Sequence, residues 1–361
     1  MTPNEKEIPK IGAAQIRLLQ RLTEACAVSG DESEVRRIVL DEIRPTVDEV
    51  RVDSLGNVLA IKRGPGEGHL RVLLAAHMDE VGFIITGDDN DGFFRFEKVG
   101  GIDTRVLPGK SVWVGKEHLP GVIGAKPIHL TTSEERRSSI LLDALRIDLG
   151  SGNGSKVKPG DRATFATSFA RLGPSLRAKA LDDRLGVATL IELVKNAPQN
   201  IDLLAAFTVQ EEVGLRGAGV AAYALDPDLA IALDSTPAQD LPTWDGSENT
   251  QYNARLGAGP AIYVADRGTL SDPRLVRHLI ETAEAAGIPY QIRQPGGGGT
   301  DSGAMHKQRT GIPSVSVSVP ARYNHTPAAI ARLSDWKHTL GLVFLALKGL
   351  NPDFWTKDER G

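Results

Sequence analysis

The 361-residue sequence predicts an α/β fold, in which a mostly parallel sheet with helices on both faces is interrupted by a small β-rich domain. Two observations predict this fold. Apolar runs of strand length alternate with helical patterns at both ends of the chain. Residues 81–171 replace that alternation with short β-type runs broken by Gly, Pro and Asp. We therefore expect a discontinuous main domain, 1–80 with 172–361, and an inserted β-rich domain, 81–171.

The elements before the insertion follow from hydrophobic periodicity. Ile16, Leu19 and Leu22 recur at helical spacing, with charged residues between them. The run 70–76 is apolar almost without interruption, which is typical of a strand buried on both faces. The other elements expected here are a helix over 33–42 and strands over 50–52 and 57–61.

The insertion and the second half of the chain differ in their expected secondary structure. Within the insertion, short β-type runs occupy 92–96, 111–114 and 122–123. After it, strands and helices alternate again, which favours a sheet covered on both sides. The elements expected there are helices over 184–195, 215–225, 273–286 and 333–350 and strands over 203–209, 229–233, 262–265 and 314–319.

Composition excludes several classes of function. Forty-two Lys and Arg against 46 Asp and Glu leave a net charge of -4, so no broad positive field attracts nucleic acid or anionic lipid. The single cysteine, Cys26, excludes an internal disulfide and a thiolate zinc cluster, and indicates a reducing compartment. Residues 1–10 are polar, and no run of about eighteen apolar residues occurs, so we expect a cytoplasmic protein without a membrane partner.

Polar residues cluster where the expected strands end. Ligands of parallel α/β sheets bind at the carboxyl ends of the strands, so residues at these positions are candidates for a site. Five candidates come directly after expected strands: His77, Asp79, Glu211, Glu212 and Asp234. Asp182 and Asp183 precede an expected helix, and His325 lies in the loop after 314–319.

Each candidate also has an ordinary interpretation. An isolated His77 is more often a core histidine bonded to a carbonyl, but Asp79, two residues later, can orient its imidazole. Glu211 and Glu212 are also consistent with a solvated acidic pair, and Asp182 with a helix cap. A site for two metal ions explains the whole set at once. Histidine and carboxylate ligands without thiolate suit zinc, cobalt or manganese.

Searches for other catalytic motifs narrow the chemistry. The sequence contains no H-E-x-x-H helix, no G-x-S-x-G elbow and no P-loop. The glycine run 296–299 is a weak phosphate-binding signal and is more often a flexible turn. Thr300 and Asp301 follow this run, and we expect them to line the substrate pocket.

Seven short motifs give the sequence a specific family resemblance. They are 53–57 (DSLGN), 76–82 (AHMDEVG), 121–127 (GVIGAKP), 180–184 (ALDDR), 209–214 (VQEEVG), 298–301 (GGTD) and 322–325 (RYNH). In this order and spacing the sequence resembles the tetrahedral and glutamyl aminopeptidases, a family of dinuclear metallo-aminopeptidases. The resemblance implies a zinc-peptidase-like sheet, a β-barrel-like insertion used for dimerisation, and dimers that assemble into a hollow dodecamer.

The resemblance also implies a role for each site residue and two divalent ions per subunit. Glu211 resembles the general base, Asp79 the residue that orients a ligand histidine, and Asp182 the ligand that bridges both ions. The other ligands implied are His77 and Asp234 at one ion, and Glu212 and His325 at the second. Zinc is the first choice, with cobalt or manganese as alternatives.

The reaction expected is hydrolysis of the N-terminal residue of peptides, with an apolar or broad side-chain preference. A glycoside hydrolase is the nearest alternative, although adjacent Glu211 and Glu212 do not flank a sugar bond as paired glycosidase acids do. A catalytically silent peptide-binding scaffold is disfavoured because Glu211 is present. A nucleotide-binding fold is disfavoured because no G-x-G-x-x-G follows an early strand.

Overall fold

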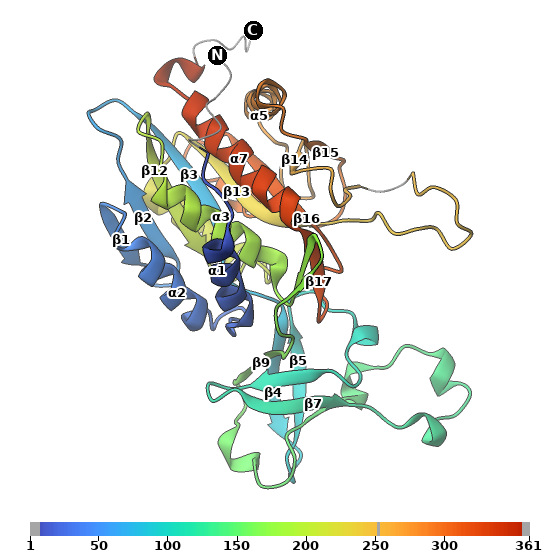
Figure 1. Ribbon diagram of the computed structural model, residues 1–361. Helices are drawn as coiled ribbons and strands as arrows, with labels where there is room; N and C mark the ends of the chain where they lie inside the picture. Colours follow the sequence, from blue (N-terminus) through green and yellow to red (C-terminus); the bar gives the residue numbers. More distant parts are fainter. Residues whose placement is uncertain (1–7, 251–252, 356–361) are drawn as a thin grey trace.

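The protein has a large α/β lobe and a smaller β lobe, which lie one above the other in Figure 1. The computed structural model describes residues 8–250 and 253–355. The chain leaves the large lobe after strand β3 and returns to it through strands β10 and β11. The large lobe contains the mixed sheet and all seven α-helices of the described chain.

The helices and strands have the following bounds. The helices are α1 Ala13–Glu24, α2 Ser33–Ile43, α3 Leu181–Lys195, α4 Arg216–Leu225, α5 Pro273–Ala286, α6 Ser302–Met305 and α7 Leu333–Gly349. The strands of the large lobe are β1 Glu49–Val52, β2 Val58–Lys62, β3 Leu70–His77, β10 Ala170–Leu172, β11 Ser175–Ala178, β12 Ile201–Thr208, β13 Leu229–Pro237, β14 Ala261–Tyr263, β15 Gln291–Arg293, β16 Ser314–Arg322 and β17 Ala329–Arg332. The strands of the small lobe are β4 Gly82–Asp88, β5 Phe93–Val99, β6 Ser111–Val114, β7 Leu119–Gly124, β8 Arg146–Asp148 and β9 Arg162–Phe165.

The large sheet has a parallel centre and antiparallel edges. Its main path runs β1-β2-β12-β3-β13-β16-β17-β11-β10, and β14 joins at β16. The four central strands, β12, β3, β13 and β16, are mutually parallel. Strands β3 and β12 are buried along almost their whole length, as the uninterrupted apolar runs predict. The predicted fold class is confirmed.

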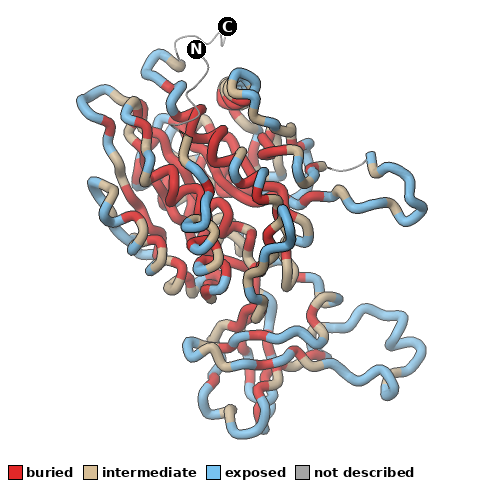
Figure 2. Tube along the Cα trace, viewed as in Figure 1, coloured by how far each residue is buried: buried red, intermediate tan, exposed pale blue. Residues whose placement is uncertain are grey.

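Helices cover both faces of this sheet. On one face α1, α2, α3, α5 and α7 enclose the larger hydrophobic core, and on the other α4 and α6 enclose a smaller one. Helix α3 is buried almost all round because it lies between the sheet and the helices α1 and α7. Figure 2 shows this continuous buried interior running through the large lobe.

The small lobe is a closed antiparallel barrel. Its strands follow the order β4-β5-β8-β7-β6-β9. Alternating residues point inward, and Phe83 packs edge-to-face on Phe96 and Phe165 at ring-centroid distances of 5.2 and 5.3 Å. The barrel therefore has its own hydrophobic core, separate from the two cores of the sheet.

Several short strands were not expected from the sequence. Strands β10, β11, β15 and β17 each have three or four residues, too few for a periodic pattern, and they pair at the edges of the sheet or against β14. Strand β14 ends at Tyr263, two residues earlier than expected. No helix in the described ranges is long and apolar enough to cross a membrane.

A buried charge network joins the two lobes. Glu80, on the segment that leaves the large lobe, accepts hydrogen bonds from Lys179 Nζ at 2.7 and 2.8 Å. Thr164 of barrel strand β9 donates to the same carboxylate at 2.8 Å. Glu80 and Lys179 are each only 2% exposed, and the fully buried Arg184 also lies 3.4 Å from Glu80 Oε1, so Glu80 is the counter-charge of two buried cations.

Glu80→Gln is expected to lower the free energy of unfolding by about 3–5 kcal/mol, because it leaves Lys179 charged and buried without a counter-charge. Denaturant unfolding of the metal-free protein at fixed protein concentration measures the change. Glu97→Gln, on the exposed side of β5, is the control and should change little. The double variant Glu80→Gln/Lys179→Met should recover part of the loss. Equal stability of Glu80→Gln and the control Glu97→Gln would contradict the role of Glu80 as a buried counter-charge.

Candidate metal centre

The candidate site lies at the carboxyl ends of the central parallel strands. His77 is the last residue of β3, and its Cα pairs in register with Thr208, the last residue of β12. Asp234 lies in β13, next to β3. The sheet therefore brings to one edge residues that are more than 150 positions apart in sequence.

Two histidines face one shared carboxylate. His77 Nε2 lies 3.3 Å from Asp182 Oδ1 and 3.8 Å from Asp234 Oδ1. His325 Nε2 lies 3.4 Å from the other oxygen, Asp182 Oδ2, and 3.2 Å from Glu212 Oε2. Asp182 thus stands between two sets of donors, each containing one imidazole and one further carboxylate.

Backbone carbonyls fix the orientation of both imidazoles. His77 Nδ1 lies 3.1 Å from the carbonyl oxygen of Asp79, and His325 Nδ1 lies 3.0 Å from that of Gly101. A carbonyl only accepts, so each Nδ1 is the donor. In the neutral imidazole the Nε2 lone pair is then directed toward Asp182, as a metal ligand requires.

Asp79 links His77 to the acidic pair that follows β12. Its carboxylate accepts from the Ser29 hydroxyl at 2.6 Å and from the backbone N–H groups of Glu211 and Glu212 at 3.0 and 3.2 Å. It also lies 3.5 Å from His77 Nδ1. Burial opposes its ionisation, but the hydrogen bond with His77 and the charge of that ring, together with the hydrogen bonds from Ser29 and Glu211, outweigh burial and lower the pKa of Asp79.

The backbone around the site is unusual for residues with side chains. Ala180, Gln210, Tyr323 and His325 all have positive φ, between 51° and 63°. Asp182 and its neighbour depart from helical angles although they lie in the first turn of α3. Such conformations are unfavourable for residues other than glycine and collect at functional sites, where the surrounding structure imposes them.

Four of the buried acidic side chains have raised pKa values, whereas the hydrogen bonds of Asp182 with His325 and His77 outweigh its burial and lower its pKa. Burial raises the pKa of Asp234 to about 7, and the charge of Asp182 adds to the effect. Burial also raises the pKa of Glu211 well above its usual value and raises that of Glu212. Asp301, buried nearby, has a pKa raised to about 6. Like charges in a desolvated space shift in this way when no cation is near.

The pKa values of the two histidines are raised, which favours their charged form. Burial by itself lowers the pKa of His325, but hydrogen bonds with Asp182 and Glu212 outweigh burial and raise it to about 11. For His77, burial is likewise outweighed by the charge of Glu211 and by its aspartate neighbours, and the pKa rises well above normal. Without a metal ion, protons on the imidazoles supply the positive charge that this carboxylate cluster needs.

The donor set fits divalent cations. Two groups have ligand atoms within 4.8 Å of one another: His77 with Asp182 and Glu212, and His77 with Asp183 and Asp234. The buried Oδ2 of Asp183 has no hydrogen-bond partner. Imidazole nitrogen and carboxylate oxygen without sulfur are ligands for zinc, cobalt or manganese.

The structure brings the seven residues expected to act in catalysis or to bind metal into one cluster. The two residues expected to line the substrate pocket, Thr300 and Asp301, are buried, at 1% and 3% exposure. The Thr300 hydroxyl lies 2.7 Å from Ser316 Oγ, inside the protein. Asp301 accepts from Thr208 and has a second oxygen without a partner.

Sequence reasoning did not assign a role in the site to three further residues. Asp183 joins the His77 group, and its adjacency to Asp182 was a usable signal. Asn324 donates to Asp182 Oδ2 at 3.2 Å and to the Ser235 hydroxyl at 2.9 Å. Ser29 orients Asp79 from 50 positions away, and no local pattern indicates such a contact.

The fold and the site together define a class of protein. Imidazoles and carboxylates that converge at the carboxyl ends of a parallel α/β sheet, in a buried acidic cluster, are typical of metal-dependent hydrolases. The sequence profile of the M42 glutamyl aminopeptidase family matches residues 56–342. The chain belongs to this family and is a peptide hydrolase.

Relatives and solved structures are similar to this chain over nearly its whole length. A lysyl aminopeptidase of Pyrococcus furiosus is 32% identical over 93% of this chain and 97% of its own. The structure of an aminopeptidase from Desulfurococcus kamchatkensis is 33% identical, has a TM-score of 0.89 and covers 96% of this chain and 98% of its own. The TET1 peptidase of Pyrococcus horikoshii, described as assembling into a tetrahedron or an octahedral shell, is 36% identical with a TM-score of 0.82, covering 93% and 100%.

Metal binding at pH 6 is expected to release protons. Asp234, with a pKa of about 7, and His325, with one of about 11, both carry a proton in the metal-free protein, whereas ligands bind metal deprotonated. At pH 9 Asp234 is already ionised, so its share of the release should disappear while that of His325 remains. Titration calorimetry with zinc in buffers of different ionisation enthalpy measures the number of protons.

His325→Ala is the matched variant for this titration. It should bind one ion fewer, or bind it much more weakly, and should release about one proton fewer at pH 9. Unchanged stoichiometry would remove His325 from the ligand set. Proton uptake on metal binding would contradict the charge state assigned to the cluster.

Proposed function

We propose that the protein is an aminopeptidase that uses two divalent metal ions, zinc in the first instance and cobalt or manganese as alternatives. Asp182 would bridge the ions, because each of its oxygens faces a different imidazole. His77 and Asp234 would complete one site, and Glu212 and His325 the other. The position of Asp182 between the two imidazoles is the observation that carries this proposal.

Glu211 is proposed as the general base. It precedes the ligand Glu212, and its backbone N–H is fixed by Asp79. Burial raises its pKa well above the ordinary value. A carboxylate whose pKa is raised is a stronger base, and can accept a proton from the attacking water and return it to the leaving amine. Bound divalent ions would lower the pKa of that water and polarise the scissile carbonyl.

Asp79 is proposed to position His77 and the acidic pair. Its contacts with the His77 ring and with the backbone N–H groups of Glu211 and Glu212 join the ends of β3 and β12. It therefore acts through the groups that it holds.

The side-chain preference is proposed to be apolar or broad. Leu215 packs against the backbone of Gly303: a Cβ atom at position 303 would lie 3.0 Å from Leu215 Cδ1. Leu215 therefore contributes an apolar surface close to Thr300 and Asp301. We propose that Thr300 and Asp301 border the substrate pocket. The relatives differ in preference, as the names glutamyl and lysyl indicate, so the pocket varies within the family.

Membership of a peptidase family favours peptides as substrates over glycans, the substrates of a glycoside hydrolase. A catalytically silent scaffold is disfavoured by the presence of all five proposed ligands with Glu211 beside them. We propose further that the protein is cytoplasmic and binds neither nucleic acid nor membranes.

A homo-oligomer, with dimers assembling into a dodecamer, is proposed from the shell-forming relative. The inserted domain, 81–171, is proposed as its dimerisation domain. The barrel lobe carries exposed apolar side chains at Ile128, Leu130 and Leu141, which are 73%, 60% and 75% exposed.

Glu211→Gln should retain metal but lower kcat by about 10²- to 10⁴-fold, because glutamine cannot accept the proton of the attacking water. Initial rates at saturating peptide, with metal content measured on the same sample, test this. Glu97→Gln, exposed on β5, should match the wild type. Substantial turnover by a fully loaded Glu211→Gln protein would exclude Glu211 as the base.

A peptide panel tests the reaction itself. The protein is stripped of metal, reloaded with zinc, cobalt or manganese, and given matched free and N-acetylated peptides. Metal-dependent release of the first residue from the free peptides alone is expected and would also identify the preferred side chain. Cleavage of acetylated peptides, or no release with either type while two ions are bound, would overturn the aminopeptidase assignment.

A further inference from the structure

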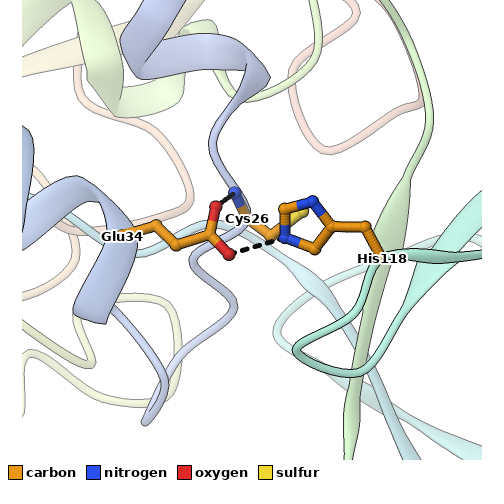
Figure 3. Close-up of side chains that lie close together, drawn as sticks. All are labelled: Cys26, Glu34 and His118. Carbon is orange, nitrogen blue, oxygen red and sulfur yellow. Dashed lines mark hydrogen bonds and ion pairs between the residues drawn. The ribbon is translucent and has the colours of Figure 1, made fainter.

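A second cluster of potential metal-binding side chains lies between the two lobes, apart from the proposed catalytic ligands and beside the buried Glu80–Lys179 pair. It consists of Cys26, Glu34 and His118, whose ligand atoms all lie within 4.8 Å of one another. Cys26 follows helix α1, Glu34 lies in the first turn of α2, and His118 lies in the turn between barrel strands β6 and β7. Figure 3 shows the imidazole of His118 directed toward Glu34 and Cys26.

Hydrogen bonds already hold two of the three side chains in place. Glu34 Oε1 lies 2.6 Å from His118 Nε2, and Glu34 Oε2 accepts from the backbone N–H of Cys26 at 2.9 Å. His118 has φ of 51°, a left-handed conformation that is uncommon for histidine. These contacts connect the large lobe to the barrel through the glutamate.

The neighbouring cations have partners of their own, and Lys179 and Arg184, whose charges act on Cys26, both pair with Glu80. Lys116 pairs with Asp31 and donates to the Ser33 hydroxyl at 3.2 Å. Arg162 donates to the backbone carbonyls of Ser29 and Gly160. A cavity of about 20 Å³ adjoins Cys26 and Glu34, enough for one water-sized occupant.

We propose that Cys26, Glu34 and His118 form a zinc site that joins the two lobes. A thiolate, a neutral imidazole and a carboxylate are all established zinc ligands, and together they carry two negative charges that balance one Zn²⁺. Ligand atoms around tetrahedral zinc lie roughly 3.3–3.8 Å apart. Glu34 Oε1 and His118 Nε2, which lie 2.6 Å apart, would separate to that spacing around an ion, and a water would complete the coordination.

Binding is coupled to proton release at this site. Burial raises the pKa of the Cys26 thiol to about 12, so the free thiol is protonated and is not a reactive nucleophile. The ion displaces the thiol proton, which leaves to solvent. No oxidation or other covalent change is involved.

The single cysteine makes this site spectroscopically distinct. The donors at the proposed catalytic site are nitrogen and oxygen, whereas Cys26 is the one cysteine of the whole sequence. A near-ultraviolet charge-transfer band from thiolate to Co²⁺ therefore reports this site alone. The readout does not depend on peptide hydrolysis, so it stands or falls separately from the proposed function.

The test is a Co²⁺ titration of the metal-stripped full-length protein, followed by competition with Zn²⁺. The wild type should develop the thiolate band, and Zn²⁺ should remove it. Cys26→Ser should lack the band and bind one ion fewer. His118→Ala and Glu34→Gln should need at least tenfold more Co²⁺ for half-saturation of the band, because each loses one ligand.

His129→Ala, an exposed histidine elsewhere in the barrel lobe, is the matched control and should titrate like the wild type. Circular dichroism checks the fold of each variant. His118 is 39% exposed, so its truncation tests the site even if a change at Cys26 disturbs packing. Absence of the band at saturating Co²⁺ would overturn the proposal. So would a band with the same half-saturation in His118→Ala and Glu34→Gln as in the wild type, which indicates adventitious binding to the thiol.

Discussion

The concentration of buried carboxylates around two imidazoles is the constraint on which the rest of the structure depends. The pKa of Asp234 is raised to about 7, chiefly by burial and further by the charge of Asp182. The protein holds these groups together because they lie at the ends of strands whose other residues form an extensive apolar core. The free energy of that core offsets the repulsion, which a bound metal ion would relieve.

The two lobes are coupled at this same point. Asp79 orients His77, and the next residue, Glu80, is the buried partner of Lys179 and Thr164 at the joint. The carbonyl of Gly101, beyond barrel strand β5, fixes the ring of His325 from the other side. The position of the barrel therefore bears on the geometry of the site, although its hydrophobic core is separate.

Much of the main sheet could be predicted because its central strands are long and apolar. Strands β3, β12, β13 and β16 were expected in place, and the rule that ligands bind at their carboxyl ends selected the site residues. The short edge strands could not be predicted, since three or four residues carry no periodic signal and their pairing partners are distant. Ser29 and Asn324 were missed as supporting residues for the same reason: their contacts depend on tertiary structure.

The sequence by itself determined the fold class, the residue types available at the strand ends and, through its ordered motifs, the family. These are properties of periodicity and of short segments. Only the tertiary structure decided that the two oxygens of Asp182 face different imidazoles, which nitrogen of each imidazole is free, and how burial shifts each pKa. It also placed His118 of the barrel against Cys26 and Glu34. Distances between residues far apart in sequence arise from packing, and no local pattern encodes them.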